Sequence, residues 1–468
     1  MALGNFDNYL DGDDLIEDLR AGLIGEGAEI VTSFGAKKIT YADYTASGRA
    51  LVQVEKFVSE QVLPFYANSH TDASFCGAYT SALREEARAL IGEQVNADGN
   101  YAIIFSGSGA TSAINRLVAL CSIKELAADS DERPVVFIGP YEHHSNILPW
   151  RESGAKVIEI EEGKTGGPDK EILEKHLKEN SENSLLIGAF SAASNVSGII
   201  ADIDGVTSLL KRYGALAFWD YAGAAPYLAI DMKPGTERQK DAVFISPHKF
   251  VGGPGASGLL IVHKACIRSK TPTWPGGGSV SYVSPWAHDY LNSVVEREEA
   301  GTPNLIGDIR AALVFMVKRA IGVDFIKKRD DELLQRAKNV WQKNAHIDLL
   351  GNSLADRLPI FSLTISNEEG NYIHHQLFTR QLSERYGIQA RGGCVCAGPY
   401  GHRLLGVCRD VSENIRRQIN LGHEDKKPGW VRLNFNCLMS DETVDYIIAS
   451  IDELANDMAA KSSNAYQI

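Results

Sequence analysis

The stretch Asp241–Gly258, DAVFISPHKFVGGPGASG, decides the fold class of this chain and contains its most unusual lysine. Its apolar run Ala242–Ile245 predicts a buried strand, which leads directly into SPHK, residues 246–249. The loop that follows is rich in glycine and proline, and such loops let the backbone approach a ligand closely. Lys249 is therefore either a solvated charge at a strand end or a reactive amine at a ligand site, and the rest of the chain decides between the two.

Seven apolar segments, beginning at residue 102, alternate with helical patterns on both sides of this stretch. They are apolar on both faces, as strands buried between two helix layers are. Such alternation predicts an open, largely parallel α/β sheet, in which ligands bind beyond the carboxyl ends of the strands. The predicted strands are Ala102–Phe105, Val135–Ile138, Val157–Ile160, Leu185–Phe190, Leu216–Trp219, Ala242–Ile245 and Leu259–Val262.

Five of these strands are followed by polar, chemically capable residues. One such loop means little, but five at the edge where this fold binds ligands indicate a site. The segments are Ser106–Thr111, Glu142–Asn146, Ser194–Gly198, Asp220 and residues 246–249.

Each segment has a structural and a functional interpretation. The glycines of Ser106–Thr111 form an ordinary turn or an anion cradle at a helix N-terminus. Asp220 caps a helix or holds a proton on a pyridine nitrogen. His143 is a hydrogen-bonded structural histidine or a ring that stacks on a cofactor and relays protons. Asn195 is a turn residue or a donor to a phenolic oxygen. With Lys249 as a Schiff-base lysine, the functional interpretation of the set is a pyridoxal phosphate site.

Composition restricts the possible partners. The chain has 468 residues, 44% hydrophobic and 23% charged, with a formal net charge of −13. The negative charge argues against nucleic acid and an anionic membrane, because both need a basic face. The acidic N-terminus is unlike a signal peptide, and no apolar run is long enough to cross a bilayer.

Seven cysteines, an odd number in a large chain, argue against a disulfide scaffold and favour a cytoplasmic protein with free thiols. Cys394 and Cys396 are spaced too closely for a usual zinc knuckle, and we expect no metal. They lie in RGGCVCAGP, residues 391–399, whose glycines and proline predict a loop. Because free cysteines are usually buried and inert, Cys396 is a candidate nucleophile, with cations such as Arg391 favouring its thiolate.

The remaining segments predict a second domain. Upstream, residues 66–78 predict a loop and residues 79–94 a helix. Residues 325–468 predict a smaller α+β domain, with strands at Ile360–Ile365 and Val431–Phe435 and helices at 372–386 and 441–459. Arg432 is a surface arginine at a sheet edge or a bidentate partner for a substrate carboxylate. We place the large cofactor-binding domain at 45–310 and the small domain at 1–44 plus 311–468.

The order of these motifs resembles the class V aminotransferase-like pyridoxal phosphate enzymes, and within them the cysteine desulfurases and selenocysteine lyases. The resemblance runs from Tyr41 to about Asp445. It implies pyridoxal phosphate fold type I, with a seven-stranded, mostly parallel sheet and a smaller α+β domain. The motifs are SGAT before a helix, EHHSNILPW, SNVSG, a strand ending in Asp220, SPHK, EAGTPN, RGGCVCAGP and VRLNFN.

For the cofactor, the resemblance implies that Lys249 forms the Schiff base, that His143 stacks on the ring and that Asp220 pairs with the pyridinium nitrogen. Asn195 resembles a donor to cofactor or substrate. Thr302 resembles a threonine that reaches the phosphate of the other subunit, which implies a homodimer. The phosphate ligands implied within the chain are Thr111, Ser246 and His248, and Ala110 is a further cofactor-binding residue.

For the substrate, the resemblance implies that Arg432 binds the carboxylate and that Cys396 attacks the substrate sulfur and becomes a persulfide. Three positions depart from the desulfurase pattern. Gly223 replaces a glutamine that contacts the phenolic oxygen, and Ser74 stands where a histidine is expected. The loop with two cysteines, Cys394 and Cys396, resembles that of the molybdenum-cofactor sulfurases more than that of the commoner desulfurases, which lack the first cysteine. These departures leave the cofactor expectation unchanged and the exact substrate open.

We therefore expect an enzyme that removes sulfur from L-cysteine, selenocysteine or a related substrate, with Lys249 as the base, His143 assisting and alanine as product. A sulfur-acceptor protein is a possible partner. The alternative is another class V reaction, such as a C–S lyase, aminotransferase or epimerase, in which Cys396 is not essential. A third interpretation, a non-catalytic cofactor-binding or scaffold protein, is disfavoured by the intact set of Lys249, Asp220 and His143.

Overall fold

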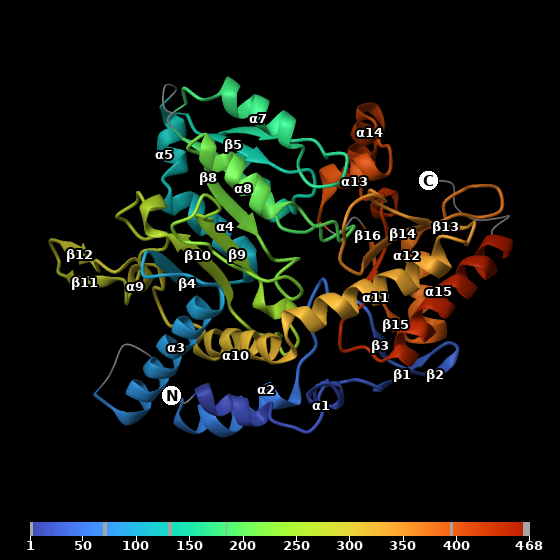
Figure 1. Cartoon of the computed structure of the whole chain (residues 1–468), viewed down its shortest axis with the longest axis horizontal. Helices are drawn as coiled ribbons and strands as arrows, with labels where there is room; N and C mark the ends of the chain where they lie inside the picture. The colour runs from blue at the N-terminus through green and yellow to red at the C-terminus, as the bar shows by residue number, and fades with distance from the viewer. Residues whose placement is uncertain (1–2, 69–72, 130–132, 184, 394–395, 462–468) are drawn as a thin grey trace.

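The computed structural model describes residues 3–68, 73–129, 133–183, 185–393 and 396–461. A seven-stranded sheet forms its centre (Figure 1). One strand, β10, runs antiparallel to both of its neighbours, and the other neighbouring pairs in the sheet are parallel. In spatial order the strands are β4 (Tyr101–Gly107), β10 (Gly258–His263), β9 (Ala242–Ile245), β8 (Leu216–Asp220), β7 (Leu186–Ser191), β5 (Val135–Ile138) and β6 (Lys156–Glu159).

All seven predicted strands are confirmed, with ends shifted by no more than two residues, and so is the mostly parallel sheet. Their side chains alternate between two separate hydrophobic clusters. In β5, Val135 and Phe137 pack into one cluster, whereas Val136 and Ile138 pack into the other. Because successive side chains of a strand point to opposite faces, a sheet covered on both sides needs apolar residues at every position.

Helices cover both faces of this sheet (Figure 1). The first cluster receives apolar side chains from α3 (Phe75–Gln94), α7 (Lys170–Glu179), α8 (Ile203–Arg212) and α10 (Leu305–Ile321). The second receives them from α4 (Gly109–Leu120), α5 (Ile123–Ala128) and α6 (Leu148–Glu152).

Helix α3 corrects one sequence-based expectation. It begins at Phe75, inside the segment 66–78 that we predicted as a loop. The hydroxyl of Ser74 accepts a hydrogen bond from the backbone N–H of Gly77 at 3.2 Å and caps the first turn. A serine at this position therefore starts the helix earlier than the apolar periodicity alone indicates.

A second, four-stranded sheet has its own hydrophobic cluster, as expected for the smaller α+β part. Helices α11, α12 and α15 pack against it. Leu3, Phe6 and Leu19 pack with the large sheet, while Ala42 and Tyr44 pack with the small one. The boundaries 45–310 and 1–44 plus 311–468 stay a prediction. The elements are β13 (Ile347–Leu349), β14 (Ile360–Ile365), β17 (Trp430–Asn434), β16 (Arg391–Gly393), α11 (Val323–Trp341), α12 (His375–Tyr386), α13 (Gly398–Leu404), α14 (Arg409–Asn420) and α15 (Asp441–Lys461).

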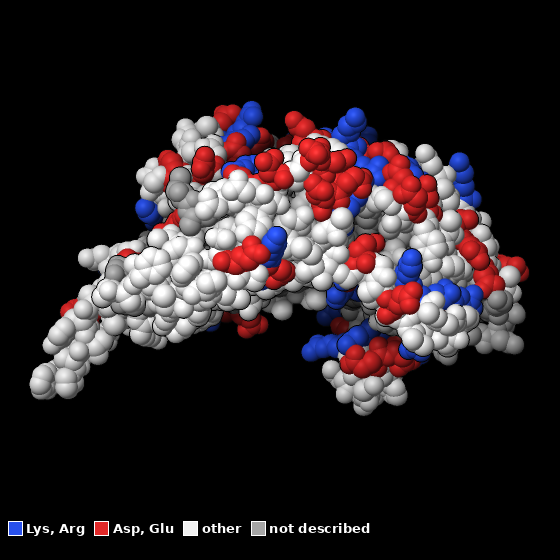
Figure 2. Space-filling view, turned by 90° about the horizontal axis from the view of Figure 1, so that it is seen from below, with Lys and Arg blue, Asp and Glu red and all other residues white. Residues whose placement is uncertain are grey.

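Shorter elements surround the two sheets. The hairpin β11–β12 projects from the body as an arm that carries few charges on the face shown in Figure 2. Within the described ranges, no helix has the length and apolar character that crossing a bilayer requires. The peripheral elements are η1 (Leu3–Tyr9), α1 (Leu15–Ala21), β1 (Glu29–Thr32), β2 (Gly35–Lys38), β3 (Thr40–Tyr41), α2 (Val52–Phe57), η2 (Val58–Val62), η3 (Leu63–Phe65), η6 (Lys264–Cys266), β11 (Val280–Val283), β12 (His288–Tyr290), α9 (Val294–Glu298), β15 (Ile388–Gln389) and η7 (Glu424–Lys426).

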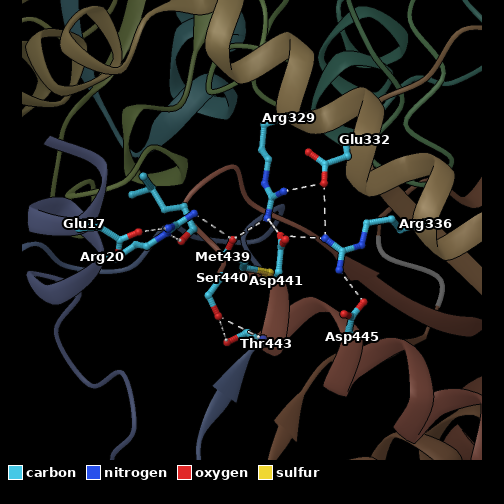
Figure 3. Close-up of polar contacts among 11 residues, drawn as sticks. Glu17, Arg20, Arg329, Glu332, Arg336, Met439, Ser440, Asp441, Thr443 and Asp445 are labelled. Atoms are coloured by element: carbon cyan, nitrogen blue, oxygen red, sulfur yellow. Dashed lines mark hydrogen bonds and ion pairs between the residues drawn. The ribbon is translucent and has the colours of Figure 1, made fainter. Parts of the chain in front are cut away.

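Ion pairs connect α11 to the start of α15, and hydrogen bonds from Arg20 connect α1 to the residues just before α15 (Figure 3). The carboxylate of Asp441 lies 2.5 Å from Arg329 Nη2 and 2.7 Å from Arg336 Nη1. Arg20 of α1 donates from Nε to the carbonyl of Leu438 at 2.7 Å. Hydrogen bonds from the two arginines lower the pKa of Asp441. Because Asp441 is exposed, we expect only a modest contribution of each pair to stability.

Candidate active site

A cavity of about 270 Å³ lies at the carboxyl ends of the central strands. It is the edge at which the sequence predicts a ligand site, because β4, β5, β7, β8 and β9 all point their carboxyl ends towards it. Thr302, by contrast, is exposed on the loop before α10 and is not a lining residue of this cavity. The predicted site residues that line the cavity are Ala110, Thr111, His143, Asn195, Asp220, Ser246, His248, Lys249, Cys396 and Arg432.

The N-terminus of α4 forms one wall and has the features of an anion cradle. Gly109 adopts φ +62°, and a Cβ there would come within 3.0 Å of the Ser246 hydroxyl. That hydroxyl accepts a hydrogen bond from the backbone N–H of Ala110 at 2.9 Å. The Thr111 and Ser145 hydroxyl oxygens lie 2.6 Å apart. Backbone donors, hydroxyls and a helix N-terminus together suit a phosphate group.

Asp220 and Lys249 lie on neighbouring strand ends. Asp220 ends β8, and Lys249 lies in η5 (Pro247–Lys249), directly after β9. The Asp220 carboxylate is buried and accepts a hydrogen bond from the Ala222 N–H at 2.8 Å. Burial raises its pKa, against an opposing effect of Lys249. Burial also lowers the pKa of Lys249 to about 8, with Asp220 acting in the opposite direction. A lysine in this condition is partly neutral near neutral pH and is available as a nucleophile or base.

His143 is a neutral ring at the cavity. It caps η4 (His144–Asn146), and its Nδ1 accepts a hydrogen bond from the Ser145 N–H at 3.1 Å. Burial and the nearby Lys249 lower the pKa of His143 to about 3. Burial and Lys249 also lower the pKa of His248, to about 4. Both rings are therefore uncharged at neutral pH, which suits His143 to stacking on an aromatic ring.

Glu142 directly precedes His143, and the sequence assigned no role to it. It is buried, and its carboxylate accepts hydrogen bonds from Asn146 Nδ2 at 2.6 Å and from the Ser191 hydroxyl and N–H at 2.7 and 2.8 Å. Burial raises its pKa to about 7. Since Ser191 ends β7 and pairs with Asp220, Glu142 connects the His143 loop to the strand ends. The signal in the sequence was a glutamate directly before two histidines in the loop after a strand.

Arg432 is not at an edge, because its strand β17 lies between β14 and β16. The guanidinium is buried; Nη2 donates to Asp43 Oδ1 at 2.8 Å and Nη1 donates to the Asn195 carbonyl at 3.1 Å. Burial lowers the pKa of Arg432, against the effect of Asp43. Within the described part of the chain, its buried Nε has no hydrogen-bond partner. An arginine that is held in place by Asp43 and lines the cavity suits a carboxylate ligand.

Asp43 is a second residue that the sequence did not reveal. Its other oxygen lies 3.0 Å from Arg391 Nε, so one carboxylate holds two arginines that line the cavity. A single aspartate in YADYT gives no sign of partners that lie far along the chain.

Cys396 lines the same cavity as Lys249 and is exposed. Its backbone adopts φ +61°, a left-handed conformation that is uncommon outside glycine. Cys394, its predicted companion, lies outside the described residues. Gly223, where the desulfurase pattern has glutamine, also lines the cavity, and a Cβ there would come within 3.3 Å of the Ala193 carbonyl.

Comparisons with known proteins agree with this arrangement. The chain is similar to a probable cysteine desulfurase of Pyrococcus abyssi, with 26% identity over 433 residues, 90% of this chain and 96% of the relative. It is 28% identical to a probable cysteine desulfurase of Halalkalibacterium halodurans over 366 residues, 77% of this chain and 84% of the relative.

Solved structures share the fold. The apo cysteine desulfurase of Thermococcus onnurineus NA1 superimposes with a TM-score of 0.73 at 24% identity, covering 94% of this chain and 98% of that one. The cysteine desulfurase CsdA of Escherichia coli gives a TM-score of 0.72 at 19% identity, covering 95% and 99%. Cysteine desulfurases thus have the fold type I architecture found here. The family model for class-V aminotransferases matches residues 40–447. With that match spanning most of its length, the chain belongs to the aminotransferase class-V family.

Proposed function

We propose that this protein is a pyridoxal phosphate-dependent cysteine desulfurase, which converts L-cysteine or a closely related substrate to alanine and leaves a persulfide on Cys396. One observation carries the proposal: a loop cysteine lines the same cavity as Lys249, Asp220 and Arg432. The names of the curated relatives support it. Selenocysteine remains within the proposed substrate class.

The residues present fit pyridoxal phosphate. Thr111, Ser246 and His248 would hold the phosphate beside Ala110, at the N-terminus of α4. A bound pyridoxal phosphate supplies an electron sink for amino-acid chemistry. His143 would stack on its ring, Asp220 would pair with its pyridine nitrogen, and Asn195 would donate to it or to the substrate.

The protein's own residues account for the rest of the chemistry. Arg432, which lines the cavity, binds the substrate carboxylate, and Lys249, with its lowered pKa, removes the proton from the substrate Cα. The Cys396 sulfur then forms a bond to the substrate sulfur while the substrate C–S bond breaks. The electron pair of the broken bond stays on carbon, which takes up a proton and becomes the methyl group of alanine, and Lys249 returns a proton to Cα.

A direct assay tests this proposal. The purified holoenzyme is given a panel of amino acids, including cysteine and selenocysteine, and the products and the intact protein mass are measured. We expect alanine from cysteine and a protein mass increased by one sulfur atom. Ammonia and a keto acid, a new amino acid or an inverted stereocentre, each without persulfide, would instead identify a different class V reaction. A protein that holds the cofactor but turns over nothing would identify a binding protein.

Replacing Asp220 with asparagine should slow proton removal from the substrate while leaving some cofactor bound. The neutral amide cannot keep the ring nitrogen charged, so we expect a loss on the order of a hundredfold or more in turnover, a few kcal/mol in the barrier. Single-turnover kinetics with α-deuterated cysteine measures the step. The control is Asp204→Asn, which removes a carboxylate paired with Lys233 outside the cavity. An unchanged rate of proton removal in Asp220→Asn would show that Asp220 has another role.

A homodimer is part of the proposal, with Thr302 donating to a phosphate bound by the partner chain. The residue is exposed on a Gly-Thr-Pro-Asn turn, 301–304, where its hydroxyl is available to another subunit. We expect a dimer in sedimentation, and weaker cofactor retention in Thr302→Val than in the matched variant Thr236→Val. An active enzyme that sediments as a monomer would refute the assignment.

The remaining expectations are also proposals. A sulfur-acceptor protein would receive the persulfide sulfur. A cytoplasmic location rests on the cysteines, six of which are described and free of disulfides. Nucleic acid, membranes and metal ions have no part in the proposed reaction.

A further inference from the structure

His144 makes two hydrogen bonds to the loop that carries Cys396. Its backbone N–H donates to the carbonyl of Cys396 at 2.8 Å. The backbone N–H of Gly398 donates to its ring Nε2 at 2.9 Å. The two bonds reach the loop on either side of Ala397, so one residue fixes the backbone directly after the thiol.

The contact is close-packed as well as hydrogen-bonded. A Cβ on Gly398 would lie 3.0 Å from His144 Nε2, so a side chain there would press on the ring. Ala397 is fully buried in a cluster with Tyr141, Tyr400 and Trp430. The left-handed backbone of Cys396 costs on the order of 1–2 kcal/mol and persists only where surrounding contacts hold it.

The neighbouring residues His143 and His144 face two different sides of the site. His143 lines the cavity, while His144 faces the Cys396 loop, and the two ring centroids are 6.1 Å apart with planes inclined at 50°. Glu142, directly before them, is fixed to the end of β7 through Ser191. The position of the thiol loop is therefore tied to the strand ends through two sets of hydrogen bonds, joined by the backbone of residues 142–144.

We propose that His144 is a positioning residue that sets Cys396 at the cavity, by accepting the Gly398 N–H and donating to the Cys396 carbonyl. The inference rests on the proposed function, because the position of the thiol matters to turnover only if Cys396 receives sulfur. His144 itself touches neither substrate nor cofactor in this role.

The protonation state of the His144 ring controls its hydrogen bond with the Gly398 N–H. Nε2 accepts the Gly398 N–H only when it carries no proton; a protonated ring would turn a second donor towards that N–H. Burial and Arg151 lower the pKa of His144. The contact is thus present at neutral pH and is lost as the pH falls through this lowered pKa. The other titratable groups around it are His143 and, from α13, His402, whose Nδ1 lies 2.8 Å from the Gly398 carbonyl, and Arg403, which pairs with Glu159.

Hydrogen exchange tests the contact without turnover. Two variants are compared in the holoenzyme: His144→Phe, which keeps a ring but removes the acceptor, and His144→Gln, whose amide oxygen can replace it. In the peptide that contains Gly398, we expect its amide to exchange at least about tenfold faster in His144→Phe, with protection restored in His144→Gln. In the wild type, the protection of the Gly398 amide should fall in acid, after correction for the pH dependence of intrinsic exchange. In His144→Gln the protection of this amide should not fall. Equal protection in all three proteins would overturn the inference.

Kinetics then separates this inference from the proposed function. His144→Phe should keep the cofactor absorption and the spectral change on adding cysteine, with KM little altered, but lose roughly tenfold or more in alanine and persulfide formation. Gly398→Ala, whose Cβ would press on the His144 ring, should also lower alanine and persulfide formation. It replaces His144→Phe in this test if that variant folds poorly. His176→Phe, on α7, is the control. Absence of persulfide in the wild type would overturn the proposed function, whereas normal persulfide formation in both variants would overturn only the role of His144.

Discussion

A Lys249→Ala variant should lose turnover completely, together with the yellow absorption expected of a cofactor joined to lysine. In the proposed reaction the Lys249 side chain is both the covalent anchor and the base, and its lowered pKa of about 8 suits it to both tasks. Nothing else described at the cavity can replace an amine, since His143 and His248 are neutral rings of low pKa. We expect a fall in kcat to the background rate, measured with cysteine as substrate and by absorption of the purified protein.

The matched control is Lys264→Ala, which removes an exposed lysine that donates to the Gly99 carbonyl away from the cavity. It should keep both colour and activity. Added methylamine should restore part of the activity of Lys249→Ala, because a free amine can take the place of the missing base. Normal catalysis by Lys249→Ala without added amine would contradict the whole cofactor proposal.

A Cys396→Ser variant should bind cofactor and cysteine normally but form neither alanine nor a persulfide. A thiolate attacks sulfur far better than an alcohol does, and the cofactor-binding residues are untouched by the change. Single-turnover reaction with cysteine, followed by alanine release and protein mass, measures the loss. We expect alanine formation to fall by several orders of magnitude.

Two other cysteines provide the comparison. Cys408, exposed near the N-terminus of α14, should be replaceable by serine without effect. Cys394→Ser should cost less than Cys396→Ser, since the family resemblance places the attacking thiol at 396. Alanine production at the normal rate in Cys396→Ser would exclude the desulfurase reaction and leave another class V chemistry.

Much of the fold could be predicted because the strands of a buried parallel sheet have a clear sequence pattern. Strands such as Ala242–Ile245 are apolar at every position, and each is bounded by polar residues at the edge that binds ligands. The common direction of the parallel strands then brings Ala110, His143, Asp220 and Lys249 to one cavity without any knowledge of tertiary contacts.

What could not be predicted depends on partners far apart in the chain. Arg432 was equally consistent with a surface position, and only the pairing of β17 with β14 and β16 places it in the interior. Glu142 and Asp43 acquire their roles from Ser191 and from two arginines that no local pattern connects to them. The early start of α3 was missed for a local reason. The composition of residues 66–78 is typical of a loop, and it obscured the capping serine at position 74.

The ion pair between Asp43 and Arg432 has a consequence for the order in which the molecule is made. The two residues are 389 positions apart, so the ribosome delivers Asp43 long before Arg432. Contacts of such long range form late and slow the folding of large chains. A nascent chain that has released residues 101–263 already holds every strand of the large sheet, yet its cavity lacks a wall. Ligand binding at the full cavity therefore requires the segment that contains Arg432, which is synthesised after every strand of the large sheet.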